Sequence, residues 1–398
     1  MDLIADSMPL KRFEKIKRFL HFVDNDKIPD DNKDFFIKVR PVIEALNETF
    51  QTCMSPPEFL AVDEAIIPFK GRSRAKQYLK KKPKKWGFKS WVLAASNGYV
   101  CKFEMYQGKR QESTSDMGVI SDTVLRLCSH ISGKNHKLFL DNLFTNYKLL
   151  KILKGKGIEV VGVFRSDRLY GADASLEEPK QFGKMKRGSM NVVTSEDNIT
   201  IVQWKDTGIV YVGSTFAGIQ PTDLVRRWDK TEKKHVMVDR PYCVQIYNKF
   251  MGGVDLSDRM VAHYPHSLKG KRFYLRIFFY LMNVAAVNAW IIFKEKTNSK
   301  MPFVDFKASI ANAMIQTACN KRKVGRPPSI TPPLKKDVAQ EYYRMFGLME
   351  KTTILSKVIL AAAGTKPARA EPDINVESVM FLSAQNVWKT FIKQTKTA

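Results

Sequence analysis

Three aspartates stand where apolar stretches of the chain break or end. Asp63 interrupts the apolar run FLAVDEAIIPF, and Asp141 directly follows the strand-like KLFL. Asp255 follows a glycine pair at the start of a helical pattern, and Asp258, three residues later, would share its helix face. Carboxylates at strand ends and at a helix start can meet over one edge of an open α/β sheet, where the sites of such sheets usually lie.

Clustered carboxylates suit the cleavage of phosphodiester bonds. Both the attacking and the leaving oxygen need their charge neutralised, and two divalent cations roughly 3.5–4 Å apart do this. Carboxylates are the ligands that Mg²⁺ and Mn²⁺ prefer over imidazole and thiolate. The pattern therefore indicates a nuclease-type site with two Mg²⁺ or Mn²⁺ ions.

Each aspartate also has an ordinary structural explanation. Asp63 could sit in a turn, and Asp141 could cap a helix that begins near Asn142. Asp255 could be a helix N-cap, with Asp258 placed favourably against the helix dipole. Taken singly, the aspartates leave both explanations open.

The elements that must position these carboxylates change character along the chain. Residues up to about Phe59 have helical periodicity. Short β-rich runs follow, to about Phe164, and helical stretches such as GVISDTVLRLCSHI and YKLLKILKGKG separate them. This alternation predicts an α/β layer with a mixed sheet. Farther on, NITIVQW and GIVYVGST are joined by KDT, which predicts a β-hairpin, and helices resume at Val244.

The charge balance points to a polyanionic partner. Lysine and arginine number 66 against 40 acidic residues, a net charge of +26. Such an excess favours binding to DNA or RNA. The run from Lys70 to Lys89 holds ten basic residues and no acid, so we expect it to contact DNA phosphates. A solvated charged hairpin and a nuclear-import signal are the alternatives. The expected phosphate contacts are Lys70, Arg72, Lys82, Lys85 and Lys89.

A second basic motif, KVGRPP, places Arg326 where an extended arginine could enter an AT-rich minor groove, and a plain basic linker is the alternative.

The five cysteines are scattered and never in CxxC spacing, which argues against a disulfide framework and a zinc knuckle and favours a reducing compartment. We expect no structural zinc.

The apolar segment IFFYLMNVAAVNAWIIF could be mistaken for a membrane span. It falls short of the usual length of about 20 residues and contains Asn283 and Asn288. The segment therefore predicts a buried core helix, and no signal-peptide core follows Met1. We expect no membrane partner.

Several long motifs, in order, resemble the piggyBac transposase family. They are SPPEFLAVDEAIIPFKGR, KKKPKKWGFKSWVLAASNGYV, LFLDNLFTNYKLL, YNKFMGGVDLSDRM and RFYLRIFFYLMNVAAVNAWIIF. The resemblance covers about three quarters of the chain, from Met8 to Glu295. It implies an RNase H-like catalytic domain of the DDD type. The resemblance assigns catalytic metal binding to Asp63, Asp141 and Asp255, and a supporting catalytic role to Asp258.

The same resemblance implies a domain plan. Residues 1–59 and 259–336 would form a helical dimerisation and DNA-binding domain. Residues 60–165 and 240–258 would form the catalytic core, 166–239 a β-rich insertion domain and 337–398 a C-terminal tail. The family's cysteine-rich, zinc-binding C-terminal domain has no counterpart after Cys243, where only Cys319 remains, and Phe273 stands where many members have tryptophan.

The implied activity is cut-and-paste DNA transposition by a nuclear homodimer. Water cleaves the element end, and the freed 3′ hydroxyl attacks first the opposite strand and later a TTAA target. The metals lower the pKa of the water and of the hydroxyl, so no general-base histidine is required. The alternative is a domesticated nuclear protein that binds DNA or chromatin and no longer transposes.

Overall fold

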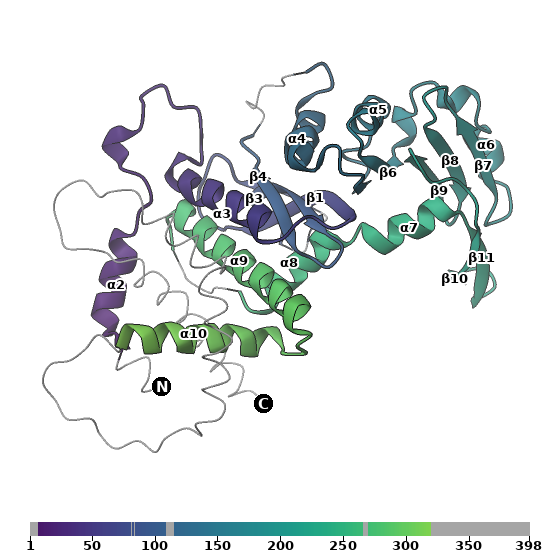
Figure 1. Cartoon of the computed structure of the whole chain (residues 1–398). Coiled ribbons are helices and arrows are strands. Elements are labelled where there is room, and N and C mark those ends of the chain that lie inside the picture. Colours follow the sequence, from purple (N-terminus) through teal and green to yellow (C-terminus); the bar gives the residue numbers. More distant parts are fainter. Residues whose placement is uncertain (1–6, 81, 83, 109–114, 266–269, 320–398) are drawn as a thin grey trace, which may run out of the picture. The chain divides into compact units, whose positions relative to one another are not determined.

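The computed structural model describes residues 7–80, 82, 84–108, 115–265 and 270–319 (Figure 1). The chain divides into two compact units. One, which we call the sheet unit, holds Pro56–Ile66 and Phe88–Asp258. The other, the helical unit, holds Met1–Ser55, Ile67–Gly87 and Arg259–Ala398, as far as these are described. This division groups Ile67–Gly87 with the helical unit, and the domain plan implied by the resemblance stays a prediction.

A large mixed sheet forms the sheet unit, with strands in the order β3-β1-β5-β6-β9-β8-β7 and with β4 paired to β3. The pairs β1–β5 and β5–β6 are parallel, whereas β3–β4, β6–β9, β8–β9 and β7–β8 are antiparallel. The predicted α/β class with a mixed sheet is confirmed. The strands are β1 (Phe59–Pro68), β3 (Trp86–Ala95), β4 (Val100–Met105), β5 (Lys137–Leu140), β6 (Glu159–Phe164), β7 (Met190–Thr194), β8 (Thr200–Lys205) and β9 (Ile209–Ser214).

The β-rich insertion continues this sheet. The hairpin of β8 and β9 forms as predicted, with the Asp206 amide donating to the Gly208 carbonyl in its turn. Strand β9 then pairs along β6, with Val161 opposite Ser214 and Phe164 opposite Tyr211. This pairing covers the edge that β6 would otherwise expose, because an open strand edge leaves amide and carbonyl groups unpaired. Strands β10 (Asp223–Asp229) and β11 (Lys234–Arg240) form a separate two-stranded ribbon.

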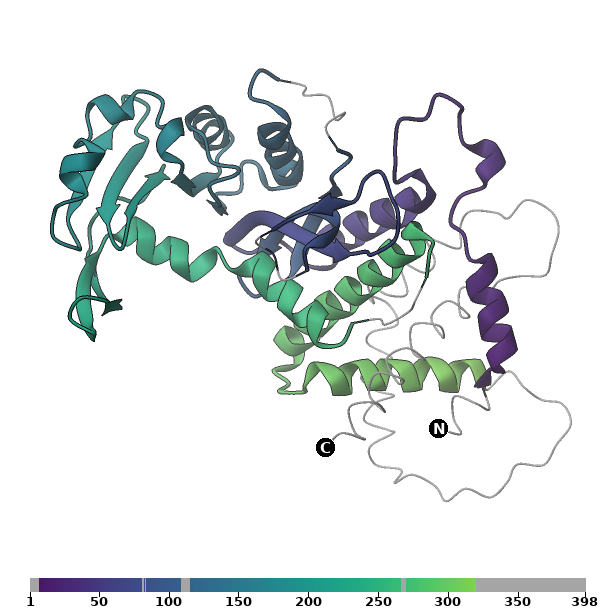
Figure 2. The same ribbon diagram turned by 180° about the vertical axis from the view of Figure 1, so that it is seen from behind.

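Helices pack against the faces of the sheet, where the side chains of its strands project. Helix α7 packs on the sheet through Cys243, Val244 and Ile246, against Phe139 and Val161 among others. Strands β5 and β6 are almost wholly apolar because both of their faces are covered. Figure 2 shows α7 leading into α8. The helices that begin in this unit are α4 (Val119–Cys128), α5 (Tyr147–Gly155), α6 (Pro179–Phe182), α7 (Tyr242–Phe250) and α8 (Gly253–His263), with 3-10 turns at Ser129–Ile131, Ser166–Arg168 and Ala172–Ala174.

The helical unit is organised around its longest helix, α9 (Phe273–Thr297). Helix α9 packs against α3 (Arg40–Cys53) and α10 (Phe303–Cys319). Among the described residues, α9 has the length and hydropathy of a membrane span, but 72% of its most apolar window is buried inside the protein. It is therefore the buried core helix that the sequence predicted. The unit also contains α2 (Leu10–Phe19), 3-10 turns at Asn25–Lys27 and Ile37–Val39, and the short strand β2 (Gln77–Tyr78).

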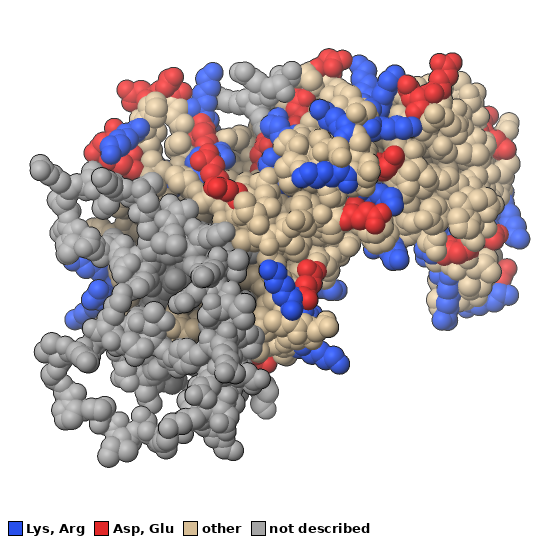
Figure 3. Space-filling model, in the orientation of Figure 1, with Lys and Arg blue, Asp and Glu red and all other residues tan. Residues whose placement is uncertain are grey.

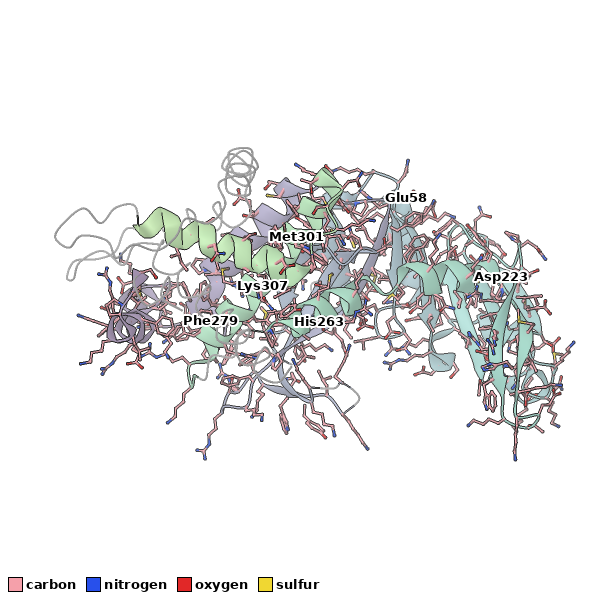
Figure 4. All side chains as sticks on the ribbon, turned by 90° about the horizontal axis from the view of Figure 1, so that it is seen from below. Glu58, Asp223, His263, Phe279, Met301 and Lys307 are labelled. Carbon is pink, nitrogen blue, oxygen red and sulfur yellow. The ribbon has the colours of Figure 1, made fainter. Side chains whose placement is uncertain are left out.

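Buried polar groups in α9 are hydrogen-bonded within this unit. The Asn283 side chain donates to the Val261 carbonyl at 2.8 Å and accepts from the Lys307 amine at 2.6 Å. The same amine donates to the Tyr264 carbonyl at 3.0 Å, and Lys307 is only 5% exposed (Figure 4). Burial lowers the pKa of Lys307 from its ordinary value to about 7.

Candidate carboxylate site

Two of the predicted carboxylates lie on neighbouring parallel strands. Asp63 is inside β1, and Asp141 is the first residue after β5. The two strands pair with Val62 opposite Leu140, so the next residue on each is Asp63 and Asp141. Neighbouring strands lie about 4.8 Å apart, which brings the two aspartates together. Both are half-buried.

Helix α7 covers the sheet face to which both carboxylates belong. Side chains alternate between the two faces of a strand, so Asp63 shares a face with Phe59 and Ala61, and Asp141 shares one with Phe139. Phe59, Ala61 and Phe139 all belong to the apolar cluster that packs against α7. The carboxylates therefore lie where this cluster ends, at the carboxyl end of β5.

Asp141 is held by a tight turn. Its carbonyl accepts hydrogen bonds from the Phe144 amide at 3.0 Å and the Thr145 amide at 3.2 Å. The Thr145 hydroxyl donates to the same carbonyl at 2.9 Å, and the Thr145 side chain is fully buried. The Thr145 side chain fits only because the neighbouring residue on β6 is Gly162. A Cβ added to Gly162 would stand 2.8 Å from Cγ2 of Thr145.

The alternative explanations for the first two aspartates are wrong. Asp63 lies in a strand and not in a turn. The helix after Asp141 is α5, and its cap is Asn146, whose side chain accepts from the Leu149 amide at 2.9 Å. The Asp63 carboxylate instead accepts a hydrogen bond from the Glu64 amide at 2.7 Å, and Asp141 begins the turn that leads to α5.

Asp255 and Asp258 lie in the first two turns of α8, which begins at Gly253. A Cβ on Gly253 would overlap the Ala95 carbonyl, so the helix starts in close contact with the end of β3. Asp255 is exposed and lies past the N-cap position, and Asp258 is half-buried. Asp255 is therefore not the N-cap but lies in the first turn, where the helix dipole stabilises an acidic side chain, whereas Asp258 lies in the second turn.

The structure thus brings together Asp63 and Asp141, whose oxygens are the hard donors that a divalent cation prefers. Within the described part of the chain, no group of three or more His, Cys, Asp or Glu side chains is arranged to hold a metal ion. The pair fits a divalent cation, and the ligand set that includes Asp255 stays a prediction.

One residue of this region was missed by the sequence analysis. Burial raises the pKa of the Tyr247 hydroxyl far above its ordinary value, and the negative charges of Asp141 and Asp63 raise it further. Tyr247 is part of α7, where a tyrosine in an apolar periodic pattern gives no sign of a polar neighbour.

The predicted phosphate contacts fall into different environments. Lys70, Arg72 and Lys85 are exposed, and Lys82 is half-buried. Lys89 differs, because its amine pairs with Glu64 at 2.7 Å and its side chain is only 12% exposed. The Lys89 amine also lies over the Trp91 ring, 3.9 Å from the centroid. Arg326 lies outside the described residues.

Basic side chains gather in two places, and in the first of them they accompany aromatic ones. In the helical unit, Tyr78 and Trp86 are about half exposed, with their rings 4.7 Å apart, and the Lys76 amine lies 4.8 Å from the Trp86 centroid. In the sheet unit, Figure 3 shows basic side chains gathered at the free end of the β10–β11 ribbon, where the turn between the strands contains exposed Lys230 and Lys233.

Phe273, which replaces a tryptophan common in the resembling family, packs inside the helical unit. Its ring lies 4.9 Å from that of Phe35 and 5.9 Å from that of Tyr274. Phe273 is half-buried, so much of its ring surface is used within the protein.

The fold is that of a mixed α/β protein with a large mixed sheet, and comparisons with known proteins specify its family. The model of the Transposase IS4 family matches residues 1–290. PiggyBac transposable element-derived protein 3 from Homo sapiens is 31% identical over 320 residues, which cover 79% of this chain and 53% of that protein. PiggyBac transposable element-derived protein 2 from Homo sapiens is 30% identical over 332 residues, with 81% and 55% covered.

The fold comparison agrees with these matches. A cryo-EM structure of the piggyBac transposase synaptic complex with hairpin DNA superposes with a TM-score of 0.65 at 21% identity, over 87% of this chain and 73% of that one. The chain belongs to the piggyBac transposable element-derived protein family and carries its IS4-type DDE transposase domain. It spans about half the length of the two human relatives.

Proposed function

We propose that this chain retains the endonuclease core of a DDD transposase, which cleaves and joins DNA strands at transposon ends and at TTAA targets. The observation that carries the proposal is the placement of Asp63 and Asp141 at neighbouring positions of two parallel strands. Asp63 does not lie in a turn and Asp141 does not cap a helix, and a divalent-cation site would use both carboxylates.

The proposed roles follow from where each side chain lies. Asp63 and Asp141 would hold a cation from the sheet face that α7 covers, and Asp255 would add a ligand from the first turn of α8. Asp258, one turn farther along α8, would support them. When bound, two Mg²⁺ or Mn²⁺ ions would lower the pKa of water and of a 3′ hydroxyl and neutralise charge on the reacting phosphate. No structural zinc is required.

DNA would be held by the positive charge of the chain. The net charge of +26 supports a polyanionic partner. We assign the phosphate contacts to Lys70, Arg72, Lys82 and Lys85, and leave Lys89 out because Glu64 already pairs with its amine. Arg326 would contact a minor groove, and the protein would act in the nucleus as a homodimer.

The test is a nicking assay on supercoiled plasmid DNA that carries TTAA sites, with Mn²⁺ or Mg²⁺ added. We expect cation-dependent nicking that Asp141→Asn abolishes while DNA affinity and thermal stability stay close to those of the wild type. Asp167→Asn is the matched control, because Asp167 is an exposed aspartate in a 3-10 turn of the same unit. A large loss of thermal stability in Asp141→Asn would instead assign that carboxylate a structural role.

A second candidate function is nuclear binding of DNA or chromatin without strand cleavage, as in a domesticated transposase. It is favoured by one observation: in the part of the chain that the structure covers, no three acidic, histidine or cysteine side chains are arranged for a metal ion. Tight, salt-sensitive DNA binding with no nicking in either metal would support this function over the first.

A further inference from the structure

The ribbon of β10 and β11 is packed on the sheet unit through one of its two faces. Because side chains alternate along a strand, this face holds three valines, which pack against the apolar cluster of the sheet: Val225, Val236 and Val238. On the same face, the Arg227 side chain donates to the Asp206 carboxylate in the turn between β8 and β9 at 3.1 Å. The Trp204 indole donates to the Asp239 carbonyl of β11 at 2.9 Å. The ribbon is therefore held in place, and its other face is presented as a fixed surface.

The opposite face of the ribbon exposes large apolar side chains. Leu224, Trp228 and Met237 are 58%, 52% and 58% exposed. The strand register places exposed Arg226 opposite Met237 and exposed His235 opposite Trp228, and the Trp228 and His235 rings lie 5.1 Å apart. Large apolar side chains that gather on one exposed face mark an interaction surface.

The turn end of the ribbon carries positive charge that the protein leaves available. Arg226 on the exposed face and Lys230 and Lys233 in the turn are exposed, and none of the three forms an ion pair within the described part of the chain. Figure 3 shows basic side chains gathered at this end. The acid on the exposed face is Asp239, which lies opposite Leu224 at the end away from the turn.

The acidic side chains near the turn are engaged within the ribbon itself. The Asp229 carboxylate accepts hydrogen bonds from the Thr231 amide at 2.8 Å and the Glu232 amide at 3.1 Å. The Glu232 carboxylate pairs with the Lys234 amine at 2.8 Å. The partner that suits this surface is thus a polyanion that also offers apolar contacts.

The major groove of duplex DNA has both properties and the right dimensions. It is about 12 Å wide and admits a two-stranded ribbon, whose strands lie about 4.8 Å apart. Inside the groove, an arginine can donate to guanine and an apolar side chain can contact the thymine methyl group. Lysines at the turn would reach the phosphates that border the groove.

We propose that the β10–β11 ribbon enters the major groove of duplex DNA, with Arg226, Trp228 and Met237 against base edges and Lys230 and Lys233 on phosphates. This inference rests on the proposed function, which takes DNA as the partner, and it adds a contact on the sheet unit to those proposed for the helical unit. It does not require strand cleavage. The competing occupant of the apolar face is a second copy of this chain.

The phosphate contacts are tested by the salt dependence of DNA binding by the full chain, measured by fluorescence anisotropy with a labelled duplex. Each phosphate contact contributes about 0.9 to the slope of log K against the logarithm of the salt concentration. The double variant Lys230→Gln/Lys233→Gln should therefore reduce this slope by about 2. The matched control is Lys134→Gln/Lys156→Gln, which removes two exposed lysines from the turns before β5 and β6 of the same unit and should keep the wild-type slope.

The groove is tested by comparing an unmodified duplex with one that contains glucosylated 5-hydroxymethylcytosine, whose glucose occupies the major groove. Glucosylation should weaken wild-type binding by at least about fivefold, which corresponds to the loss of one bidentate base contact. The effect should be smaller in Arg226→Gln/Trp228→Ala, which has already lost the groove contacts. Both side chains are exposed, so this variant should fold as the wild type does.

The outcomes separate this inference from the proposed function. An unchanged salt slope in Lys230→Gln/Lys233→Gln, or an equal effect of glucosylation in the wild type and in Arg226→Gln/Trp228→Ala, would overturn the role of the ribbon alone. Self-association in sedimentation velocity that Trp228→Ala abolishes, with DNA affinity unchanged, would assign the face to a second copy and overturn it too. A wild-type chain that binds no duplex DNA would overturn the proposed function as well.

Discussion

Gly162→Ala should disturb the turn that holds Asp141 without touching Asp141 itself. The added Cβ would stand 2.8 Å from Cγ2 and 3.2 Å from Cβ of Thr145, and closer still to Oγ1. Carbon atoms in contact prefer separations of about 3.5–4.0 Å, so one of the two residues must move by several tenths of an ångström. Thr145 is fully buried and its hydroxyl is bonded to the Asp141 carbonyl at 2.9 Å and the Leu140 carbonyl at 3.3 Å.

Overpacking of this kind typically costs about 1–3 kcal/mol. Since every 1.4 kcal/mol is about tenfold in an equilibrium constant, the turn should open several-fold to more than tenfold more often. Amide hydrogen exchange at Phe144 and Thr145 measures this opening directly, because both amides donate to the Asp141 carbonyl. We expect both amides to exchange faster in Gly162→Ala by that factor.

Two further variants make this prediction specific. Gly155→Ala is the control, because nothing lies within 4 Å of the added Cβ, and it should be neutral or stabilise α5 by up to about 1 kcal/mol. Thr145→Ala removes the clashing atoms, so Gly162→Ala combined with Thr145→Ala should cost less than the sum of the two single changes. Additive costs, or unchanged exchange in Gly162→Ala, would refute the steric argument.

Two other predictions concern buried amines. Burial lowers the pKa of Lys307 in the folded protein to about 7, whereas a lysine in the unfolded chain has a pKa of about 10.4. Between these two pH values the unfolded chain therefore binds one more proton than the folded protein. The free energy of unfolding should rise with pH over this window, by on the order of 4 kcal/mol. Urea unfolding followed from pH 7 to 10 should lose this rise in Lys307→Met, and an unchanged slope would contradict it. Lys89→Met should cost about 3 kcal/mol, because it breaks the partly buried pair with Glu64. Lys85→Met changes an exposed lysine, so it should alter the free energy of unfolding by less than about 0.5 kcal/mol. The same variant should bind DNA more weakly in a filter-binding assay. Equal losses of stability in Lys89→Met and Lys85→Met would contradict this distinction.

The sequence predicted those parts of the fold that local patterns specify. The KLFL strand, the YKLLKILKGKG helix and the hairpin around KDT all have short-range signals, namely an apolar run, helical periodicity and two β-rich segments joined by a turn. The register that makes Asp63 a neighbour of Asp141 follows from pairing Val62 with Leu140, which are far apart in the chain. The sequence pattern allowed these two aspartates to meet at one sheet edge and the motif resemblance implied that they do, but only the strand register makes them neighbours.

The remaining features depend on contacts between distant segments. Strand β9 pairs with β6 across about fifty residues, so no local pattern indicates that the insertion continues the sheet. The count of basic residues cannot distinguish Lys89, which pairs with Glu64, from its exposed neighbours. Tyr247 has the periodicity of an ordinary helix core position, so nothing in the sequence indicated that the charges of Asp141 and Asp63 raise the pKa of its hydroxyl.

The most direct test of the central claim is a crystal structure of the protein soaked in Mn²⁺, with the ion located by its anomalous scattering. The account predicts an anomalous peak shared by the Asp63 and Asp141 carboxylates, with metal–oxygen distances of about 2.1 Å. A structure with Mn²⁺ bound elsewhere, or with these two carboxylates on opposite faces of the sheet, would contradict it.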